Sequence, residues 1–372
     1  MSRNFRIIVA GDVIRPTADG DRSSQNVNIQ WLHKLVRRPL MQATGVEPAL
    51  MLAGRDFDFK AFYAKCGTDA SLLSWAGLYK REDLPSAALE MIYAHFGDAL
   101  VIGFELNALF RRAFEYLGIP YIDCVIHPVR FLDDLMFGVS TNLPGVFEAA
   151  MGWRYDEERI YLAAAAIEAR SIREKPLLPP DIRVLAMGQT TDDKTLIHEG
   201  RIGRWSDFRP AMKSLTGPRD RIAFKPHPYA LGEVDVYDAG LAFSRIVETS
   251  ENFYKLVSHE QIETVVSLSS STSTEARYFG RKGVHLLQEP FSFATTGAEG
   301  FALDRYIAVF DDWMSSDFWR SLLGPVMGTS STDGSRVHPS PHRLRVSLNA
   351  FWGFNEVSID QLIAPSLVKL RK

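Results

Sequence analysis

Short apolar runs alternate with longer amphipathic segments along the whole chain. In the first half, the runs FRIIVAGDVI, ALMLAG, ALVIGFE and PYIDCVI are rich in aliphatic and β-branched residues, as buried strands are. The segments NVNIQWLHKLVRR and LNALFRRAFEYLG carry apolar positions at helical spacing, and the second ends at Gly118 with Pro120 close behind. DEERIYLAAAAIEARSIRE is a further helix, with acidic residues at its start and basic residues near its end. The pattern predicts an α/β fold.

The proline-rich segment EKPLLPPDIR has no periodicity and is the best candidate for a domain boundary. After it the alternation restarts with strand-like IRVLAMG, RIAFK, ETVVSLS, GVHLL and RYIAVF, and with helices near FRPAMKSL and TEARYFG. We therefore predict two Rossmann-like domains, each a parallel sheet with helices on its faces. The predicted domains are 1–175 and 176–340, facing one another across a cleft that opens near residues 173–182. A helical segment, 341–372, follows them.

Composition limits the kind of protein this is. The chain has 372 residues, of which 46% are hydrophobic, and a formal net charge of −3. That length favours two domains, and that charge argues against broad binding of nucleic acid. Cys66 and Cys124 are the only cysteines, a usage that suits a reducing compartment. The first apolar run is too short for a signal peptide, and no run approaches the ~20 residues that span a bilayer. We expect a cytoplasmic protein, with peripheral association at the inner membrane left open.

Ligands of parallel α/β sheets bind beyond the carboxyl ends of the strands, so the polar residues after each strand are the first candidates for a site. The stretch SLSSSTSTEA follows one strand and leads into a helix. Its hydroxyls at Ser269, Ser270 and Ser271, together with the free N–H groups of the helix start, are suited to hold a phosphate. Ordinary capping of the helix, with Glu275 completing a capping box, is the alternative.

A second candidate is the histidine in FKPHPY. Lys225 ends a strand, and His227 lies between two prolines that restrict the backbone on both sides of it. A histidine there is able to contact a phosphate while Lys225 adds positive charge. A purely structural histidine in a proline turn is the alternative.

A third candidate is the acidic pair in GQTTDDKT. Asp192 and Asp193 follow a strand directly, where one of them is placed to act as a nucleophile or general base at the cleft. The alternative is a solvated turn, since Asp and Thr favour loops.

Together, the motifs GQTTDDKTLIHEG, FKPHPY and SLSSSTSTEARYFGRKGVHLLQEPFSF resemble the nucleotide-binding half of the capsular-polysaccharide β-Kdo transferases. Kdo is 3-deoxy-D-manno-oct-2-ulosonic acid. Bacterial sialyltransferases of the GT-B fold show a similar His-Pro motif and serine motif, and they also use CMP-activated sugars. The resemblance covers roughly residues 183 to 293. It implies the GT-B fold, in which two Rossmann-like domains face each other, and a CMP-sugar donor with no metal or other cofactor.

The resemblance also assigns roles to residues of this chain. It implies that His227, Ser269 and Ser270 bind the CMP phosphate, with Lys225 beside them, and that Asp193 is the nucleophile of a retaining reaction. Gln189, Pro228 and Glu275 lie within the same motifs and are also binding candidates. The chain departs from the family pattern at two positions: Gly188 stands where an aspartate is frequent, and Asp192 where a glycine is frequent. The extra carboxylate keeps Asp192 as a second catalytic candidate.

The first domain is then expected to bind the acceptor. Glu105 ends the strand VIGFE and leads into a helix, and it is the candidate general acid/base; charging of a helix start is the alternative. Asp123 and His127, from YIDCVIHPVRFLDD, are secondary candidates, and Arg130 from the same stretch is suited to meet a carboxylate. Arg15, after the first strand, faces the same cleft.

These observations predict a retaining glycosyltransferase that moves Kdo or a related 2-keto sugar acid from CMP-β-Kdo to a bacterial surface polysaccharide, whose acceptor end is expected to be lipid-linked. Two other activities fit the same motifs. One is an inverting CMP-sialic acid transferase, and the other is a polysaccharide pyruvyl transferase that uses phosphoenolpyruvate. A non-catalytic module that binds nucleotide or glycan is a third class, against which the carboxylates at 105, 192 and 193 argue.

Overall fold

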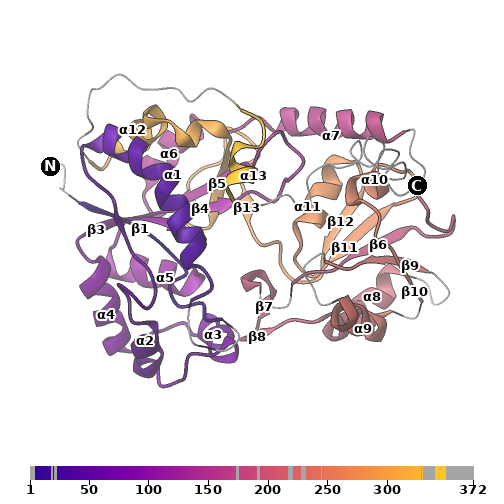
Figure 1. Ribbon diagram of the computed structural model, residues 1–372, viewed down its shortest axis with the longest axis horizontal. Helices are drawn as coiled ribbons and strands as arrows, with labels where there is room; N and C mark the ends of the chain where they lie inside the picture. The colour runs from indigo at the N-terminus through magenta and orange to yellow at the C-terminus, as the bar shows by residue number, and fades with distance from the viewer. Residues whose placement is uncertain are drawn as a thin grey trace, which may run out of the picture.

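The computed structural model describes residues 5–17, 20, 23–172, 176–190, 193–216, 221–227, 232–243, 245–327, 329 and 340–348. Two α/β domains lie side by side (Figure 1), each built on its own sheet. The predicted pair of Rossmann-like domains is confirmed, since the described strands form two separate large sheets, one of seven strands and one of five. No helix within these ranges combines the length and apolar character needed to cross a membrane.

The first sheet has seven strands in the order β13-β14-β5-β4-β3-β1-β2. They are β1 (Arg6–Gly11), β2 (Ala49–Leu50), β3 (Ala99–Phe104), β4 (Tyr121–Ile126), β5 (Phe137–Thr141), β13 (Ser292–Phe293) and β14 (Arg305–Val309). Strands β2, β1, β3 and β4 pair in parallel, but β5 is antiparallel to both β4 and β14. The prediction of a wholly parallel sheet is therefore wrong for this edge.

Successive residues of β1 point to opposite faces of this sheet, and each face has its own layer of helices. Ile7 and Val9 pack with α1 (Asn26–Thr44), α6 (Pro144–Met151) and α12 (Ser316–Leu323). Ile8 and Ala10 pack with α2 (Phe59–Lys65), α3 (Leu72–Tyr79), α4 (Ser86–Phe96) and α5 (Ala108–Leu117). With both faces covered, polar groups of the central strands reach solvent only at the strand ends.

The second sheet has five parallel strands in the order β10-β9-β6-β11-β12. They are β6 (Val184–Met187), β9 (Ile222–Lys225), β10 (Ile246–Glu248), β11 (Thr264–Ser267) and β12 (Lys282–His285). On one face lie α7 (Glu157–Ser171), α10 (Phe253–Val257) and α11 (Ser271–Tyr278). On the other lie α8 (Arg209–Leu215) and α9 (Gly232–Ala242). The three strands β6, β9 and β11 thus bring their carboxyl ends together.

The chain crosses between the domains at places other than the predicted boundaries of 175 and 340. Helix α7 buries Ile160, Ala164 and Ile167 in the core of the second domain, so the first crossing precedes α7 instead of following it. Strands β13 and β14 and helix α12 return to the first domain (Figure 1). A helix or strand belongs to the domain whose core its apolar residues pack into. The position of the proline-rich segment does not indicate that packing, so it did not mark the boundary.

The end of the described chain also returns to the first domain. Helix α13 (Arg343–Leu348) places Leu344 in the first domain's core. Both oxygens of Asp134 hold its start, accepting hydrogen bonds from the backbone N–H of Leu344 (2.8 Å) and of Arg345 (3.0 Å). The expectation that a C-terminal helix packs against the first domain is confirmed for these residues, while 349–372 lie outside the described residues.

Replacing Asp134 with alanine should release α13. Three backbone N–H groups, those of Leu135, Leu344 and Arg345, would lose their acceptor, at a cost of about 1–3 kcal/mol in the free energy of unfolding. Arg345 is fully buried, so trypsin should cleave after it faster in Asp134→Ala. The control is Asp133→Ala, because Asp133 contributes only its backbone carbonyl to His342. Equal cleavage of both variants at the wild-type rate would contradict this role.

Candidate active site

A cavity of about 380 Å³ opens between the two domains, at the carboxyl ends of β3, β6, β9 and β11. Its volume is typical of a small-molecule site. Most of the predicted site residues line it: Arg15, Glu105, Arg130, Gln189, Asp193, His227, Ser269, Ser270 and Ser271. The prediction that strand ends of both domains converge on one cleft is therefore confirmed.

The loops after β6 and β11 are tied to each other by Gln189. Its side-chain amide donates to the hydroxyls of Thr195 (2.9 Å) and Ser269 (2.9 Å), and its amide oxygen accepts from the backbone N–H of Ser269 (3.2 Å). Asp193 accepts a hydrogen bond from the N–H of Thr195 (2.9 Å) through Oδ1. Gln189 and Ser269 are nearly buried, so their polar groups mainly hold this wall of the cavity in shape.

The start of α11, where the sequence predicted an anion site, lies at the cavity wall. Ser270 is the N-cap, with its hydroxyl accepting from the N–H of Thr272, and Ser271 follows at the cavity wall. His227 lines the same cavity, and burial lowers its pKa while Asp193 opposes the shift. A neutral histidine donates one N–H, and a bound phosphate would favour its protonated form. Lys225 does not line the cavity but donates to the backbone carbonyl of Ser250 (3.3 Å).

Glu105 has an unusual backbone. Its φ is +51°, in the left-handed region that costs a non-glycine residue about 1–2 kcal/mol. Three hydrogen bonds hold this conformation: Glu105 N–H to the Cys124 carbonyl (2.9 Å), the Lys194 ammonium to the Glu105 carbonyl (3.1 Å), and Leu106 N–H to Asp123 (2.8 Å). Strain of this kind is concentrated at functional sites, where the surroundings enforce it. The side chain of Glu105 is thereby directed to the cavity.

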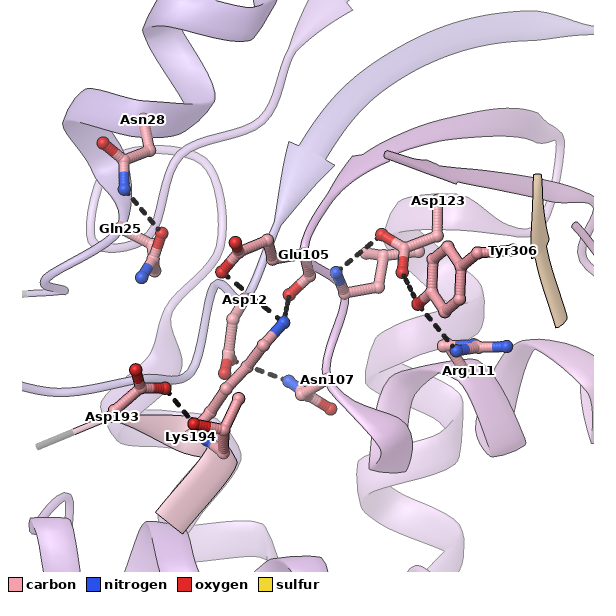
Figure 2. Close-up of polar contacts among 12 residues, drawn as sticks. Asp12, Gln25, Asn28, Glu105, Asn107, Arg111, Asp123, Asp193, Lys194 and Tyr306 are labelled. Atoms are coloured by element: carbon pink, nitrogen blue, oxygen red, sulfur yellow. Dashed lines mark hydrogen bonds and ion pairs between the residues drawn. The ribbon is translucent and has the colours of Figure 1, made fainter. Parts of the chain in front are cut away.

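Lys194 is a residue of this site that sequence analysis did not single out. Its side chain is only 12% exposed, and its Nζ lies 3.5 Å from Oε2 of Glu105, across the domain boundary. Figure 2 shows the ammonium between the Glu105 carboxylate and its carbonyl. The only signal in the sequence was its position directly after Asp193.

Arg130 is another cation of the cavity wall, and the second domain holds its loop in place. The backbone N–H of Arg130 donates to Oε1 of Glu275 (2.6 Å), and the same oxygen accepts from the Tyr254 hydroxyl (2.9 Å). Within the described ranges, no hydrogen bond or ion pair engages the Arg130 guanidinium. The carboxyl groups of Glu275, Glu105 and Asp193 act on this cation electrostatically. A cation that faces a cavity without a hydrogen-bonded partner among the described residues is suited to bind an anionic ligand.

Three predicted site residues lie behind the cavity wall instead of on it. Asp123 is fully buried, with its oxygens bound to the N–H of Leu106 and the hydroxyl of Tyr306 (2.7 Å). His127 accepts from the N–H of Val129 (3.0 Å), and burial lowers its pKa to about 3. Glu275 is buried as well. Contrary to the prediction, these three side chains do not line the cavity, and each instead holds neighbouring backbone or side chains in place.

Two further candidates, Asp192 and Pro228, lie outside the described residues. Asp12, which follows β1, is buried and accepts hydrogen bonds from Asn107 (2.7 Å) and from the indole of Trp75 (3.2 Å). In the part of the chain that the structure describes, no three His, Cys, Asp or Glu side chains are grouped so as to hold a metal ion. The absence of a metal from the reaction stays a prediction.

No protein-family model matches this chain, and no curated protein matches it. Among solved structures, KpsC of Thermosulfurimonas dismutans, described as a beta Kdo 2,7 transferase, is 12% identical with a TM-score of 0.37, covering 74% of this chain and 76% of that one. A second KpsC structure from the same organism, a beta Kdo 2,4 transferase, is 20% identical with a TM-score of 0.31, covering 49% and 66%.

Both descriptions name the activity of the family that the sequence motifs resemble. The fold class agrees as well, since this chain has two Rossmann-like domains around a cavity, as GT-B enzymes do. At these identities and TM-scores the likeness does not argue for a function, which has to rest on the site itself.

The buried carboxyl of Glu275 predicts a specific dependence of stability on pH. Burial raises its pKa from 4.5 to about 7. Between these values the unfolded chain ionises Glu275 while the folded chain keeps it protonated, so stability is lost as the pH rises through this window. The free energy of unfolding should therefore fall, relative to Glu275→Gln, by up to about 3 kcal/mol between pH 4.5 and 7. Urea titrations of both chains at several pH values measure this, and a pH-independent difference would contradict it.

Proposed function

We propose that this chain is a retaining glycosyltransferase that moves Kdo, or a related 2-keto sugar acid, from its CMP-activated form to a polysaccharide acceptor. One observation carries the proposal. A single cavity combines the anion-binding groups Arg130, His227 and the start of α11 with two carboxylates, Glu105 and Asp193, which come from opposite domains.

The anion-binding groups match the two charges of such a donor. A CMP-sugar carries a phosphodiester and a sugar carboxylate. The hydroxyls and N–H groups at the start of α11, with His227 beside them, are suited to the phosphate. Arg130 would take the carboxylate, because it faces the cavity without a hydrogen-bonded protein partner among the described residues. These groups suffice to bind the leaving group electrostatically, and we propose that the reaction proceeds without a metal.

The two carboxylates would act in sequence. Asp193 attacks the anomeric carbon, forming a C–O bond as the bond to the phosphate oxygen breaks and CMP leaves with the electron pair. Glu105 then takes the proton from an acceptor hydroxyl, whose oxygen attacks the same carbon and displaces the Asp193 carboxylate. Two displacements restore the original configuration, as in retaining glycosidases. The acceptor would enter from the side of the first domain, where Glu105 and Arg15 lie.

The two alternative activities, inverting sialyl transfer and pyruvyl transfer, would use the residues of this cavity differently. An inverting sialyltransferase would need only a base such as Glu105 and no nucleophile, and a pyruvyl transferase would bind phosphoenolpyruvate in place of CMP. The presence of Asp193 in the cavity, on the domain opposite Glu105, favours two displacements. A lipid-linked acceptor, a cytoplasmic location and peripheral membrane association stay predictions.

Nucleotide-dependent stabilisation tests this proposal. CMP at a hundred-fold excess over its Kd should stabilise the chain by about 2.7 kcal/mol, and UDP, GDP and phosphoenolpyruvate should not. His227→Ala should abolish most of the CMP shift in melting temperature and lower transfer roughly 10²–10³-fold. His259→Ala, which removes a partly buried histidine outside the cavity, is the control. A shift with phosphoenolpyruvate but none with CMP would replace the proposal with pyruvyl transfer.

A further inference from the structure

The segment 193–202, here called the docking loop, belongs to the second domain by sequence but lies against the first. It leaves β6 through Asp193 and contains the 3-10 turn Lys194–Leu196 and a small antiparallel hairpin of β7 (Ile197–His198) and β8 (Arg201–Ile202). Ile197 and Ile202 pack against the core that α3 and α5 share with β1. Figure 1 shows this hairpin beside α3, between the domains.

Lys194 is the polar anchor of the docking loop. Its ammonium donates to the Glu105 carbonyl (3.1 Å) and pairs with the Glu105 carboxylate (3.5 Å). It also lies 5.8 Å from the ring centre of Phe291. The buried carboxylates of Asp12 and Asp123 interact with the same ammonium electrostatically. Since Lys194 is only 12% exposed, these contacts are shielded from the solvent that weakens surface ion pairs.

The contacts of Lys194 join the two carboxylates of the proposed reaction. Asp193 directly precedes Lys194 in the chain, so the candidate nucleophile is the neighbour of the residue that holds the candidate acid/base. The carbonyl that Lys194 binds belongs to the residue with φ of +51°. Losing this bond would remove one of three hydrogen bonds that hold Glu105 in its left-handed conformation.

We propose that Lys194 is a positioning residue: it docks the loop that carries Asp193 onto Glu105 and so sets the placement of the two carboxylates relative to each other. The role of these carboxylates rests on the proposed function, but the docking itself does not. Groups that orient a reacting side chain through contacts of this kind typically contribute 10–100-fold to activity.

Two variants separate positioning from simple charge. Lys194→Met keeps the length of the side chain but loses the ammonium, whereas Lys194→Arg keeps a cation that is able to reach Glu105. With CMP-Kdo as donor, we expect Lys194→Met to lower kcat by 10–100-fold with less than a three-fold change in KM for the donor. Lys194→Arg should recover most of the loss. Lys213→Met, an exposed lysine of α8, is the matched control.

A double-mutant cycle tests whether Lys194 acts through Glu105. If it does, Lys194→Met should have little further effect on kcat in a Glu105→Gln background. Additive losses would overturn the proposal. So would a weakening of CMP-Kdo binding as large as the loss in kcat, because Lys194 would then be a donor ligand.

Amide hydrogen exchange tests the docking without any substrate. In the full chain, Lys194→Met should accelerate exchange of residues 105–107, and Lys213→Met should not. Unchanged exchange in Lys194→Met would overturn the positioning role whatever the donor is. If Lys194→Met shows faster exchange but the wild-type chain does not turn over CMP-Kdo, the positioning role stays in place and only the donor assignment is rejected.

Discussion

The ion pair between Lys194 and Glu105 joins the two domains where the strand ends of both sheets meet. The pair is partly buried and lies beside the carboxylates of Asp12 and Asp123, so removing the cation would leave like charges close together in a poorly solvated place. Asp193 directly precedes the lysine of this pair and Glu105 is its acidic partner (Figure 2), so the contact connects the loop that carries one proposed carboxylate to the other carboxylate.

A second link between the domains holds Arg130, another residue of the cavity wall. Glu275, from α11, holds the N–H of Arg130, which belongs to the loop between β4 and β5. That loop also places Val129, Phe131 and Leu132 in the core of the second domain. Arg130 is thereby fixed relative to the serines at the start of α11. Arg130 is thus held by the second domain, which is the domain proposed to bind the nucleotide, although Arg130 follows a strand of the first domain's sheet.

The sequence was sufficient to predict the fold class and the groups that follow strands directly. Asp193, His227 and Ser270 were found because apolar strands are easily recognised and polar residues just after them face the cleft. Lys194 was missed because its role depends on a side chain that crosses to another domain, which no local pattern reports. Glu275 and Asp123 were predicted to lie in the site because they are near strand or helix ends. Those positions were correct, but tertiary packing buries both side chains, which the local sequence does not indicate. The return of β14 to the first sheet likewise depends on packing between distant segments.

The central claim is that Asp193 forms a covalent bond with the sugar in the first displacement and that Glu105 deprotonates the acceptor hydroxyl in the second. Mass spectrometry of the chain after brief incubation with CMP-Kdo, without acceptor, tests this most directly. The account predicts one Kdo residue on the peptide that contains Asp193, accumulating as CMP is released, and no adduct in Asp193→Asn. An adduct on any other residue, or near-normal sugar transfer by Asp193→Asn, would contradict it.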